Sequence, residues 1–329
     1  MGYLCIDLEI IKKNLNNVCI NGIVCKSNFY GLGYELLNYL KKDIDVLYIS
    51  NINEYKNIKK YLTSSIDVVI LYPRDEDYIH YRNRQNLFLC INSVKTIKLL
   101  GDNIKNYNNL IVRVDDFLGL HGIPSEELLK TSPLPGVKKI LVHINEWVSN
   151  EEQNIIENIC HYAQNNKYDF SIGGTKAMKL FDNKAPIEFR YGAKLFHSND
   201  ISPASLYVNI INTWDAGSKS IVIGYKSDCK EISKGFLILI DIGYGDWQLI
   251  TRIYQKKITL KSGNHIFSIP VYPCMNSMWL VSDDPIDMNE EICFFQDISD
   301  VYEICDKLDV DFDEFTTSFN ANLQRQYIN

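Results

Sequence analysis

A single lysine ends a short apolar run near the start of the chain. Residues 20–33 read INGIVCKSNFYGLG, in which Lys26 closes the run and Gly31 and Gly33 follow. An apolar strand can desolvate an amine and lower its pKa, which favours covalent chemistry with carbonyl compounds, and glycines let backbone approach a ligand. Taken alone, the pattern also fits a solvated lysine that caps a strand.

Further polar residues stand near the ends of later apolar runs. Arg113 and Asp115 lie in the apolar run 110–115, the fifth of the chain. His143 lies in the sixth, 139–144, and Arg190 in the eighth, 187–191. In a barrel of parallel strands these positions share the rim that carries active sites. Singly, His143 could be a core histidine with its hydrogen bonds satisfied, and Arg190 could be a surface ion-pair residue. Their joint placement with Lys26 favours a site.

Small residues follow two of these runs. Gly173, Gly174 and Thr175 end the seventh run and precede a helical pattern, and Gly192 and Ala193 follow the eighth. Barrels hold phosphate at this place through backbone N–H groups and a helix N-terminus. The glycine pair alone is equally compatible with a plain turn.

The elements that position these residues alternate between apolar runs and amphipathic segments over the first 190 residues. This alternation predicts βα units around a parallel sheet, and eight units predict a closed (β/α)8 barrel of the TIM type. The predicted strands are 22–26, 46–50, 68–72, 87–91, 110–115, 139–144, 170–174 and 187–191.

Apolar spacing of three and four residues predicts the helices between the strands. Ser149 and Glu152 form a capping box before one of them. Because a typical barrel has about 250 residues, this one must have short helices, and 77–84 is expected to hold only a turn. The predicted helices are 35–42, 53–62, 94–100, 151–163 and 176–181.

The pattern changes after residue 198 to short alternating strands, as in an antiparallel sheet, with a helix over 301–308. We therefore expect a barrel domain over 1–198, whose extreme N-terminus can pair with the second domain, and a β domain over 199–329. The predicted β segments are 207–214, 220–224, 235–242, 249–260, 265–271 and 278–282.

Composition narrows the partners and the compartment. The net charge of -7, with no run of basic residues, argues against nucleic-acid binding. Nine scattered cysteines fit reduced thiols better than disulfides or a metal site. The start lacks the features of a signal peptide, and no run of 18 apolar residues occurs. We expect a cytoplasmic protein without a metal ion or a membrane partner.

Seven short motifs together resemble those of the alanine racemases, pyridoxal phosphate (PLP) enzymes built from a barrel and a β domain. The resemblance covers nearly the whole chain, in matching order and spacing. The motifs are CKSNFYGLG, VRVDDFLGLHGI, LVHIN, FRYGAKLF, IDIGYGDW, PCMN and RQY.

The resemblance implies roles for individual residues. Lys26 would hold PLP covalently and act as one base, and Tyr244 would be the other. Arg190 would contact the pyridine nitrogen, and His143 would lie beside the ring. The residues matching phosphate-binding positions are Tyr30, Thr175, Gly192, Ala193 and Tyr327.

The resemblance also implies racemisation in a dimer. A guanidinium does not give up its proton, so it leaves the pyridine nitrogen largely uncharged and the ring a weaker electron sink. Two flanking bases could then move the α-proton from one face to the other. The family brings Lys26 and Tyr244 together across a head-to-tail homodimer.

The chain departs from the family around the substrate. Leu120 replaces an arginine that helps to anchor the substrate carboxylate, Arg113 replaces the carbamylated lysine that supports it, and Asn276 replaces an aspartate. Either Arg113 supplies the missing charge, or the Met275 backbone and the Asn276 amide hold the carboxylate, or the substrate differs.

These features predict a PLP-dependent racemase of a small amino acid, with alanine first and serine second. A PLP-binding relative without racemase activity is the alternative. A decarboxylase is disfavoured by Arg190, because that reaction calls for an acidic group at the pyridine nitrogen.

Overall fold

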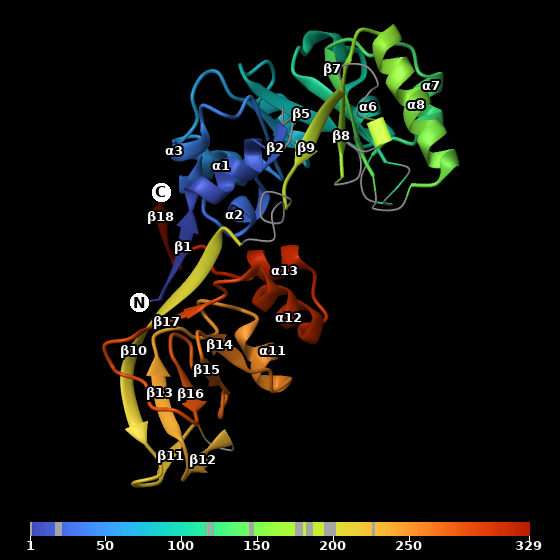
Figure 1. Ribbon diagram of the computed structural model, residues 1–329. Helices are drawn as coiled ribbons and strands as arrows, with labels where there is room; N and C mark the ends of the chain where they lie inside the picture. The colour runs from blue at the N-terminus through green and yellow to red at the C-terminus, as the bar shows by residue number, and fades with distance from the viewer. Residues whose placement is uncertain are drawn as a thin grey trace. The chain divides into compact units, whose positions relative to one another are not determined.

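The computed structural model describes residues 2–329 except 17–21, 116, 118, 120, 121, 145–147, 175–179, 182–186, 194–201, 226 and 227. The chain divides into two compact units (Figure 1). The barrel unit comprises Leu15–Phe29 and Tyr34–Lys194, and the β unit comprises Met1–Asn14, Tyr30–Gly33 and Leu195–Asn329.

Eight parallel strands close the barrel, as the sequence predicts. Each strand pairs with the next, and the last pairs with the first through Gly22 and Arg190. Every predicted barrel strand is present within a few residues of its expected ends. The strands are β2 (Gly22–Val24), β3 (Val46–Ile49), β4 (Asp67–Ile70), β5 (Leu87–Ile91), β6 (Leu110–Val114), β7 (Val137–His143), β8 (Asp169–Gly173) and β9 (Ile187–Tyr191).

The barrel interior is filled by side chains at alternate positions of each strand, because successive residues of a strand point to opposite faces. One buried cluster comes from five strands in succession, so the interior is a packed core rather than a pore. Its members are Tyr48, Val69, Cys90, Ile111 and Leu141.

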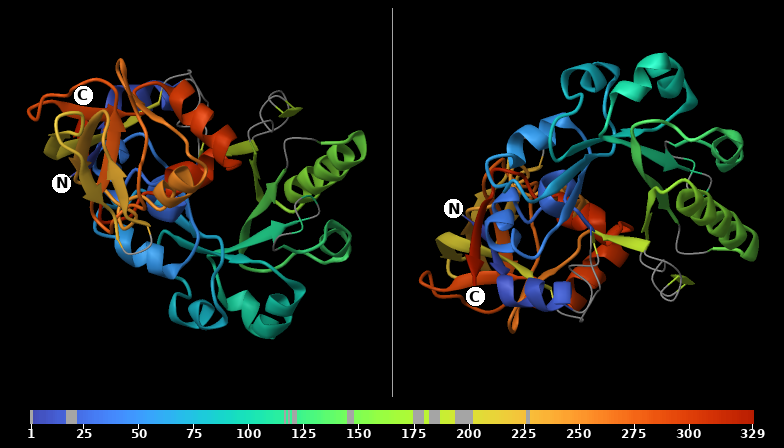
Figure 2. Two further views of the ribbon diagram at one scale, coloured as in Figure 1. Left: turned by 90° about the horizontal axis from the view of Figure 1, so that it is seen from below. Right: turned by 90° about the horizontal axis from the view of Figure 1, so that it is seen from above.

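Short helices follow most of the strands, as the chain length predicts. The predicted capping box of α8 is confirmed: the Ser149 N–H donates to Glu152 Oε2 at 2.7 Å, and the Glu152 N–H donates to Ser149 Oγ at 3.2 Å. Figure 2 shows α8 on the outer side of the barrel strands. The predicted helix 176–181 lies outside the described residues except for its last two. The helical elements are α2 (Lys26–Tyr30), η1 (Tyr34–Leu36), α3 (Leu37–Leu40), α4 (Ile52–Ile58), α5 (Asp75–His80), α6 (Val94–Leu100), η2 (Gly101–Asn106), α7 (Ser125–Lys130) and α8 (Asn150–Asn165).

The expectation that 77–84 holds only a turn is wrong, because α5 occupies part of it. The Arg74 N–H donates to the Asp77 carboxylate at 2.8 Å and caps the helix. Tyr78 is 1 % exposed, and its hydroxyl donates to the Cys90 carbonyl at 2.5 Å. This tertiary anchor stabilises a helix whose short sequence shows little periodicity of its own.

The β unit is built on a sheet in the order β16-β13-β10-β1-β18, with β17 also paired to β10. Most pairs are antiparallel, as predicted, but β1 and β18, the two ends of the chain, pair in parallel. The strands of the unit are β1 (Tyr3–Asp7), β10 (Ala204–Asp215), β11 (Ile221–Ile223), β12 (Lys230–Ile232), β13 (Phe236–Ile240), β14 (Leu260–Ser262), β15 (His265–Phe267), β16 (Met278–Ser282), β17 (Glu291–Phe294) and β18 (Gln324–Ile328).

One predicted β segment, 249–260, is largely wrong, since α11 (Ile250–Gln255) occupies its first half. Ile250 and Ile253 are fully buried, and their spacing of three puts both on one helix face. Only the end of the segment enters β14. The remaining helices are α1 (Leu8–Asn16), α12 (Ile298–Leu308) and α13 (Phe312–Thr317). None of the helices in the described ranges combines the length and apolar character needed to cross a bilayer.

Candidate active site

Three neighbouring barrel strands place His143, Gly173 and Arg190 in one row. In the parallel pairing, His143 is opposite Gly173, and Gly173 is opposite Arg190. The row lies at the carboxyl ends of β7, β8 and β9, the rim where barrel enzymes carry their active sites. The polar residues at these strand ends thus converge, as the sequence predicts.

Gly173 is the small residue that lets its two neighbours meet. A Cβ at this position would lie 2.5 Å from His143 Nδ1 and 2.8 Å from Arg190 Nη2. Both distances are shorter than any real contact of a methyl group, so a side chain here must displace the imidazole or the guanidinium. The imidazole and guanidinium therefore pack over bare backbone.

Arg190 is held firmly inside the rim. It is 7 % exposed; Nη1 donates to Ser171 Oγ at 2.8 Å, and Nη2 donates to the Val142 carbonyl at 2.7 Å. Its guanidinium carbon lies 5.2 Å from the centre of the Tyr48 ring. Burial lowers the pKa of Arg190, but a guanidinium stays protonated in proteins. The site therefore keeps a fixed cation.

The surroundings of His143 strongly lower the pKa of its imidazole. Burial, followed by the nearby charges of Arg190, Arg113 and Lys26, lowers the pKa of His143 to about 3. The imidazole is therefore neutral at neutral pH, with one nitrogen as donor and the other as acceptor. The same charges show that Lys26, Arg113 and Arg190 all lie around His143.

Lys26 begins a turn of unusual backbone conformation. Strand β2 ends at Val24, two residues earlier than Lys26, and Ser27 to Tyr30 then adopt φ values of 54°, 56°, 56° and 51°. Left-handed backbone costs roughly 1–2 kcal/mol per residue outside glycine. Such strained conformations cluster at functional sites, and here the strain immediately follows the candidate lysine.

Glu54 and Tyr34 hold this turn in place. Glu54 accepts from the Ser27 N–H at 2.7 Å and from the Ser50 N–H at 2.7 Å. The Tyr34 hydroxyl accepts from the Asn28 N–H at 3.2 Å, while Asn28 Oδ1 accepts from the Tyr34 N–H at 3.1 Å. The motif around Lys26 did not point to Glu54, because its contribution depends on packing between α4 and a distant turn.

Arg113 lies inside the barrel, on β6. It is 5 % exposed, and Nη1 donates to the Tyr72 hydroxyl at 2.9 Å. Its guanidinium carbon is 5.3 Å from the centre of the Tyr72 ring. Asp115 directly follows the strand. Leu120, the residue that departs from the family pattern, lies outside the described residues.

In the β unit, Tyr244 sits in a turn that is bonded to the Met275 segment. The Tyr244 N–H donates to the Cys274 carbonyl at 3.0 Å, and the Gly245 N–H donates to the Met275 carbonyl at 2.8 Å. Asn276 Nδ2 donates to Asp246 Oδ1 at 3.3 Å. The unit thus groups Tyr244, Met275 and Asn276.

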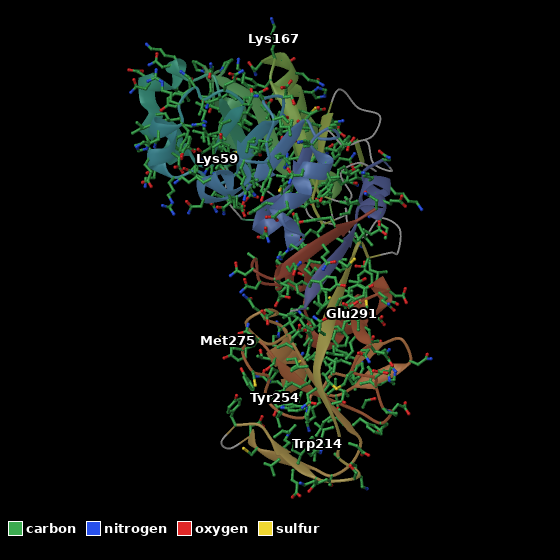
Figure 3. All side chains as sticks on the ribbon, turned by 90° about the vertical axis from the view of Figure 1, so that its left-hand side faces the viewer. Lys59, Lys167, Trp214, Tyr254, Met275 and Glu291 are labelled. Carbon is green, nitrogen blue, oxygen red and sulfur yellow. The ribbon has the colours of Figure 1, made fainter. Side chains whose placement is uncertain are left out.

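These residues lie at the surface of the β unit. Tyr244 is 38 % exposed and Met275 is 59 % exposed, and Figure 3 shows Met275 at the margin of this unit. The Tyr244 and Tyr272 rings lie 6.2 Å apart. Tyr225 is also exposed and interacts with Tyr244, and we call the three residues the tyrosine patch.

The end of the chain is bonded to the segment after Lys26. The Tyr327 hydroxyl donates to the Leu32 carbonyl at 2.8 Å, and Arg325 Nε donates to the Gly31 carbonyl at 2.8 Å. Tyr30 begins this segment and is 6 % exposed. Two of the predicted phosphate ligands, Tyr30 and Tyr327, therefore belong to one local structure.

The remaining predicted phosphate ligands come from the barrel. Gly192 and Ala193 directly follow β9 and are half-buried. Thr175 lies outside the described residues. Gly173, which ends β8, was predicted as part of this phosphate-binding run, whereas its contact distances give it the separate role of admitting His143 and Arg190.

The donor set fits PLP. Lys26 carries the primary amine that covalent attachment of PLP requires, and Arg190 carries a cation that keeps its proton and would suit the ring nitrogen. In the described part of the chain, no group of three His, Cys, Asp or Glu side chains is arranged to hold a metal ion.

A Gly173→Ala variant should bind PLP at least roughly tenfold more weakly, because the new methyl group displaces His143 or Arg190. Equilibrium dialysis with PLP measures the change, and Gly217→Ala, where a new Cβ would approach only the flexible Asp215 carboxylate, is the control. Unchanged affinity in Gly173→Ala would show that the row does not form the cofactor pocket.

Comparison with known proteins agrees with this architecture. Neither a family model nor a curated protein sequence matches the chain. Among solved structures, alanine racemase from Clostridium difficile 630 has a TM-score of 0.79 at 18% identity, covering 99% of this chain and 95% of its own. Alanine racemase from Bartonella henselae, with covalently bound pyridoxal phosphate, has 0.78 at 19% identity and 99% coverage of both chains.

A racemase with another substrate is also similar. Histidine racemase from Leuconostoc mesenteroides subsp. sake NBRC 102480 has a TM-score of 0.73 at 16% identity, covering 100% of this chain and 98% of its own. At these identities the likeness establishes the architecture. The chain therefore has the fold of the alanine racemases, a barrel followed by a β domain, as its motifs predict.

Proposed function

We propose that this protein is a PLP-dependent amino-acid racemase that moves the α-proton of a small amino acid between two faces. The observation that carries the proposal is the grouping of Lys26, His143 and Arg190 at the carboxyl ends of three barrel strands. The fold supports the proposal, because the similar solved structures are racemases. Alanine is the first substrate to test, and serine is the second.

In the proposed site, Lys26 binds PLP covalently and serves as one base. When bound, PLP supplies the electron-withdrawing ring that acidifies the α-hydrogen. Arg190 meets the ring nitrogen with a cation that keeps its proton, so electron withdrawal stays moderate and simple proton exchange is favoured. Neutral His143 packs beside the ring and adds no further charge.

The phosphate is assigned to the residues that match phosphate-binding positions of the family that the chain resembles. Gly192 and Ala193 offer backbone N–H groups after β9, and Tyr30 and Tyr327 offer hydroxyl groups. Thr175 completes the set by its position after β8. These contributions suit an anion, because a phosphate accepts several hydrogen bonds at once.

Tyr244 is proposed as the second base, supplied by a second copy of the chain. A tyrosine has an ordinary pKa of about 10, so it needs a nearby cation to work as a base. The tyrosine patch around it supports an interface, since exposed apolar patches commonly mark protein–protein contacts. In this arrangement a homodimer has two shared sites and a monomer has no complete site.

The substrate carboxylate is assigned to Arg113, which takes over the charge that Leu120 lacks. Arg113 is a buried guanidinium close to His143, and its one described hydrogen bond goes to the neutral Tyr72 hydroxyl. Met275 and Asn276 offer a backbone N–H and an amide as additional donors. Asn276 also bonds Asp246, which fixes the turn that carries Tyr244.

An Arg113→Ala variant should lose roughly 30-fold or more in kcat/KM, because truncation of a buried guanidinium–carboxylate pair typically costs about 2–5 kcal/mol. PLP affinity should change little. Tyr72→Phe, which removes only the described partner of Arg113, is the control and should retain most activity. Steady-state kinetics at low substrate concentration measures both variants.

Leu120→Arg tests the same assignment from the other side. The resemblance matches position 120 to a substrate-binding position, where a second guanidinium would repel Arg113, so this variant should be impaired. Improved turnover of alanine in Leu120→Arg, together with normal turnover in Arg113→Ala, would contradict the assignment of the carboxylate to Arg113.

The proposed function is tested by incubating the purified protein and PLP with L-alanine, L-serine, L-histidine and other L-amino acids. Chiral chromatography then measures D-isomers. We expect D-isomer formation from at least one small amino acid. PLP binding without any D-isomer would contradict racemisation and favour a non-racemising PLP-binding protein.

A further inference from the structure

A charged pair lies inside the barrel, below the row that holds Arg190. Glu188 precedes Arg190 by two positions on β9, so both side chains point into the barrel. Lys139 stands four positions before His143 on β7 and shares its face. The Lys139 and Glu188 side chains are only 12 % and 13 % exposed, and Nζ lies 2.5 Å from Oε2. The motifs around the site do not include this pair.

One hydroxyl group connects the pair to Arg190. Arg190 Nη1 donates to Ser171 Oγ at 2.8 Å, and Ser171 Oγ donates to Glu188 Oε1 at 2.8 Å. The Ser171 hydroxyl has a single hydrogen, which it uses toward Glu188, so its lone pair remains for Arg190. Each of the two hydrogen bonds, from Arg190 to Ser171 and from Ser171 to Glu188, therefore has one donor and one acceptor.

Glu188 is the negatively charged group at the end of the hydrogen-bonded series that starts at Arg190. Burial by itself raises the pKa of Glu188, but Lys139 and hydrogen bonds from Lys139, Tyr48 and Ser171 outweigh burial and lower it. The carboxylate is therefore ionised at neutral pH. The two acceptors bonded to Arg190, Ser171 and the Val142 carbonyl, are neutral. The carboxylate of Glu188 is therefore linked to the guanidinium indirectly, through the Ser171 hydroxyl.

The surroundings leave Glu188 little freedom. The Tyr48 hydroxyl also donates to Glu188 Oε1, and its ring lies beside Arg190. A Cβ on Gly22 would come within 2.7 Å of the Tyr48 ring and 3.2 Å of Glu188 Oε1. A carboxylate packed this tightly can transmit a fixed position to the groups bonded to it.

Lys139 has more room than Glu188. It lines a cavity of about 250 Å³ at the amino ends of the strands, together with Asp67, Lys138 and Asp169. The cavity leaves space for water beside the Lys139 ammonium group, and the carboxylates of Asp67 and Asp169 also line it. The two members of the pair are therefore unequal: Lys139 lines the cavity, whereas Glu188 is bonded through Ser171 to Arg190.

We propose that Glu188 is a positioning residue, which fixes Arg190 through Ser171 and so sets the contact of Arg190 with the pyridine nitrogen. Lys139 keeps Glu188 ionised and in place. This inference rests on the proposed function, because Arg190 meets a ring nitrogen only when PLP occupies the site.

The test uses the full-length protein loaded with PLP that carries 15N in the ring. Variants Glu188→Gln and Ser171→Ala should move the ring-nitrogen resonance in the same direction as Arg190→Lys. Each should weaken PLP binding roughly tenfold, the effect of losing one hydrogen bond to a charged group. The double variant Ser171→Ala/Glu188→Gln should not exceed the larger single effect, because both act through one chain.

A second comparison separates positioning from stability. Lys139→Met and Glu188→Gln each leave one unpaired charge or a broken contact, and both should lower the thermal stability of the apoprotein. The double variant Lys139→Met/Glu188→Gln should recover stability and still show the altered ring-nitrogen resonance. If the pair only stabilises the barrel, the double variant recovers both. Glu303→Gln, in an ion pair of the β unit, is the control.

Two results would overturn the inference. If Arg190→Lys moves the resonance while Glu188→Gln and Ser171→Ala leave it unchanged, Arg190 meets PLP but Glu188 does not position it. If the unaltered protein fails to bind PLP, or Arg190→Lys leaves the resonance unchanged, the assignment of the ring-nitrogen contact falls, and the inference falls with it.

Discussion

Replacing Lys26 by alanine is expected to abolish the covalent bond between this protein and PLP while leaving the protein folded. Lys26 follows β2 and begins the left-handed turn that Glu54 and Tyr34 hold, so removing its side chain leaves these backbone contacts in place. Racemase activity should fall by at least roughly 10³-fold, since both the attachment point and one base are lost.

Borohydride reduction in the presence of PLP, followed by peptide mass spectrometry, measures this change. In the unaltered protein the label should be on the peptide that contains Lys26, and the Lys26→Ala protein should carry none. Lys59→Ala, at an exposed position just after α4, is the control and should be labelled normally. A label that persists in Lys26→Ala would assign the attachment to another lysine and remove the basis of the proposed site.

Mixing two inactive variants, Lys26→Ala and Tyr244→Phe, should restore activity. In a dimer with shared sites, a mixed pair combines the intact Lys26 of one copy with the intact Tyr244 of the other. Random exchange makes about half of the dimers mixed, each with one complete site, so about a quarter of the normal activity should return. Neither variant should recover activity alone.

The assay follows racemisation after subunit exchange, and exchange itself is measured with two differently tagged copies. The double variant Lys26→Ala/Tyr225→Phe, which also changes the same patch outside the proposed chemistry, serves as the control partner for Tyr244→Phe and should restore activity as Lys26→Ala does. Complete exchange without any return of activity would contradict a site shared between two copies.

The sequence predicted the barrel well because its signals are local. An apolar run followed by a polar residue recurs eight times, and each run becomes a strand of the closed barrel. Parallel strands have their carboxyl ends on one rim, so the sequence alone predicts that His143 and Arg190 meet there. Their alignment with Gly173 follows from the register of the pairs.

The features that the sequence did not predict depend on contacts between distant segments. The left-handed turn after Lys26 is stabilised by Glu54, which lies 27 residues beyond Ser27. Lys139 and Glu188 meet only because the closed barrel places β7 and β9 on either side of β8. In the β unit, α11 was predicted as a strand because apolar residues in a short segment fit either period.

Following the α-hydrogen of L-alanine in deuterated water tests the proposed racemisation most directly. If another amino acid is the preferred substrate, it replaces L-alanine in this experiment. Two bases on opposite faces remove a proton from the L-isomer and deliver a deuteron from the solvent to the other face. We therefore predict that the D-isomer formed early in the reaction carries deuterium at Cα, while the remaining L-isomer does so only slowly. Deuterium that appears in the L-isomer without formation of the D-isomer, or the absence of any exchange with PLP bound, would contradict the account.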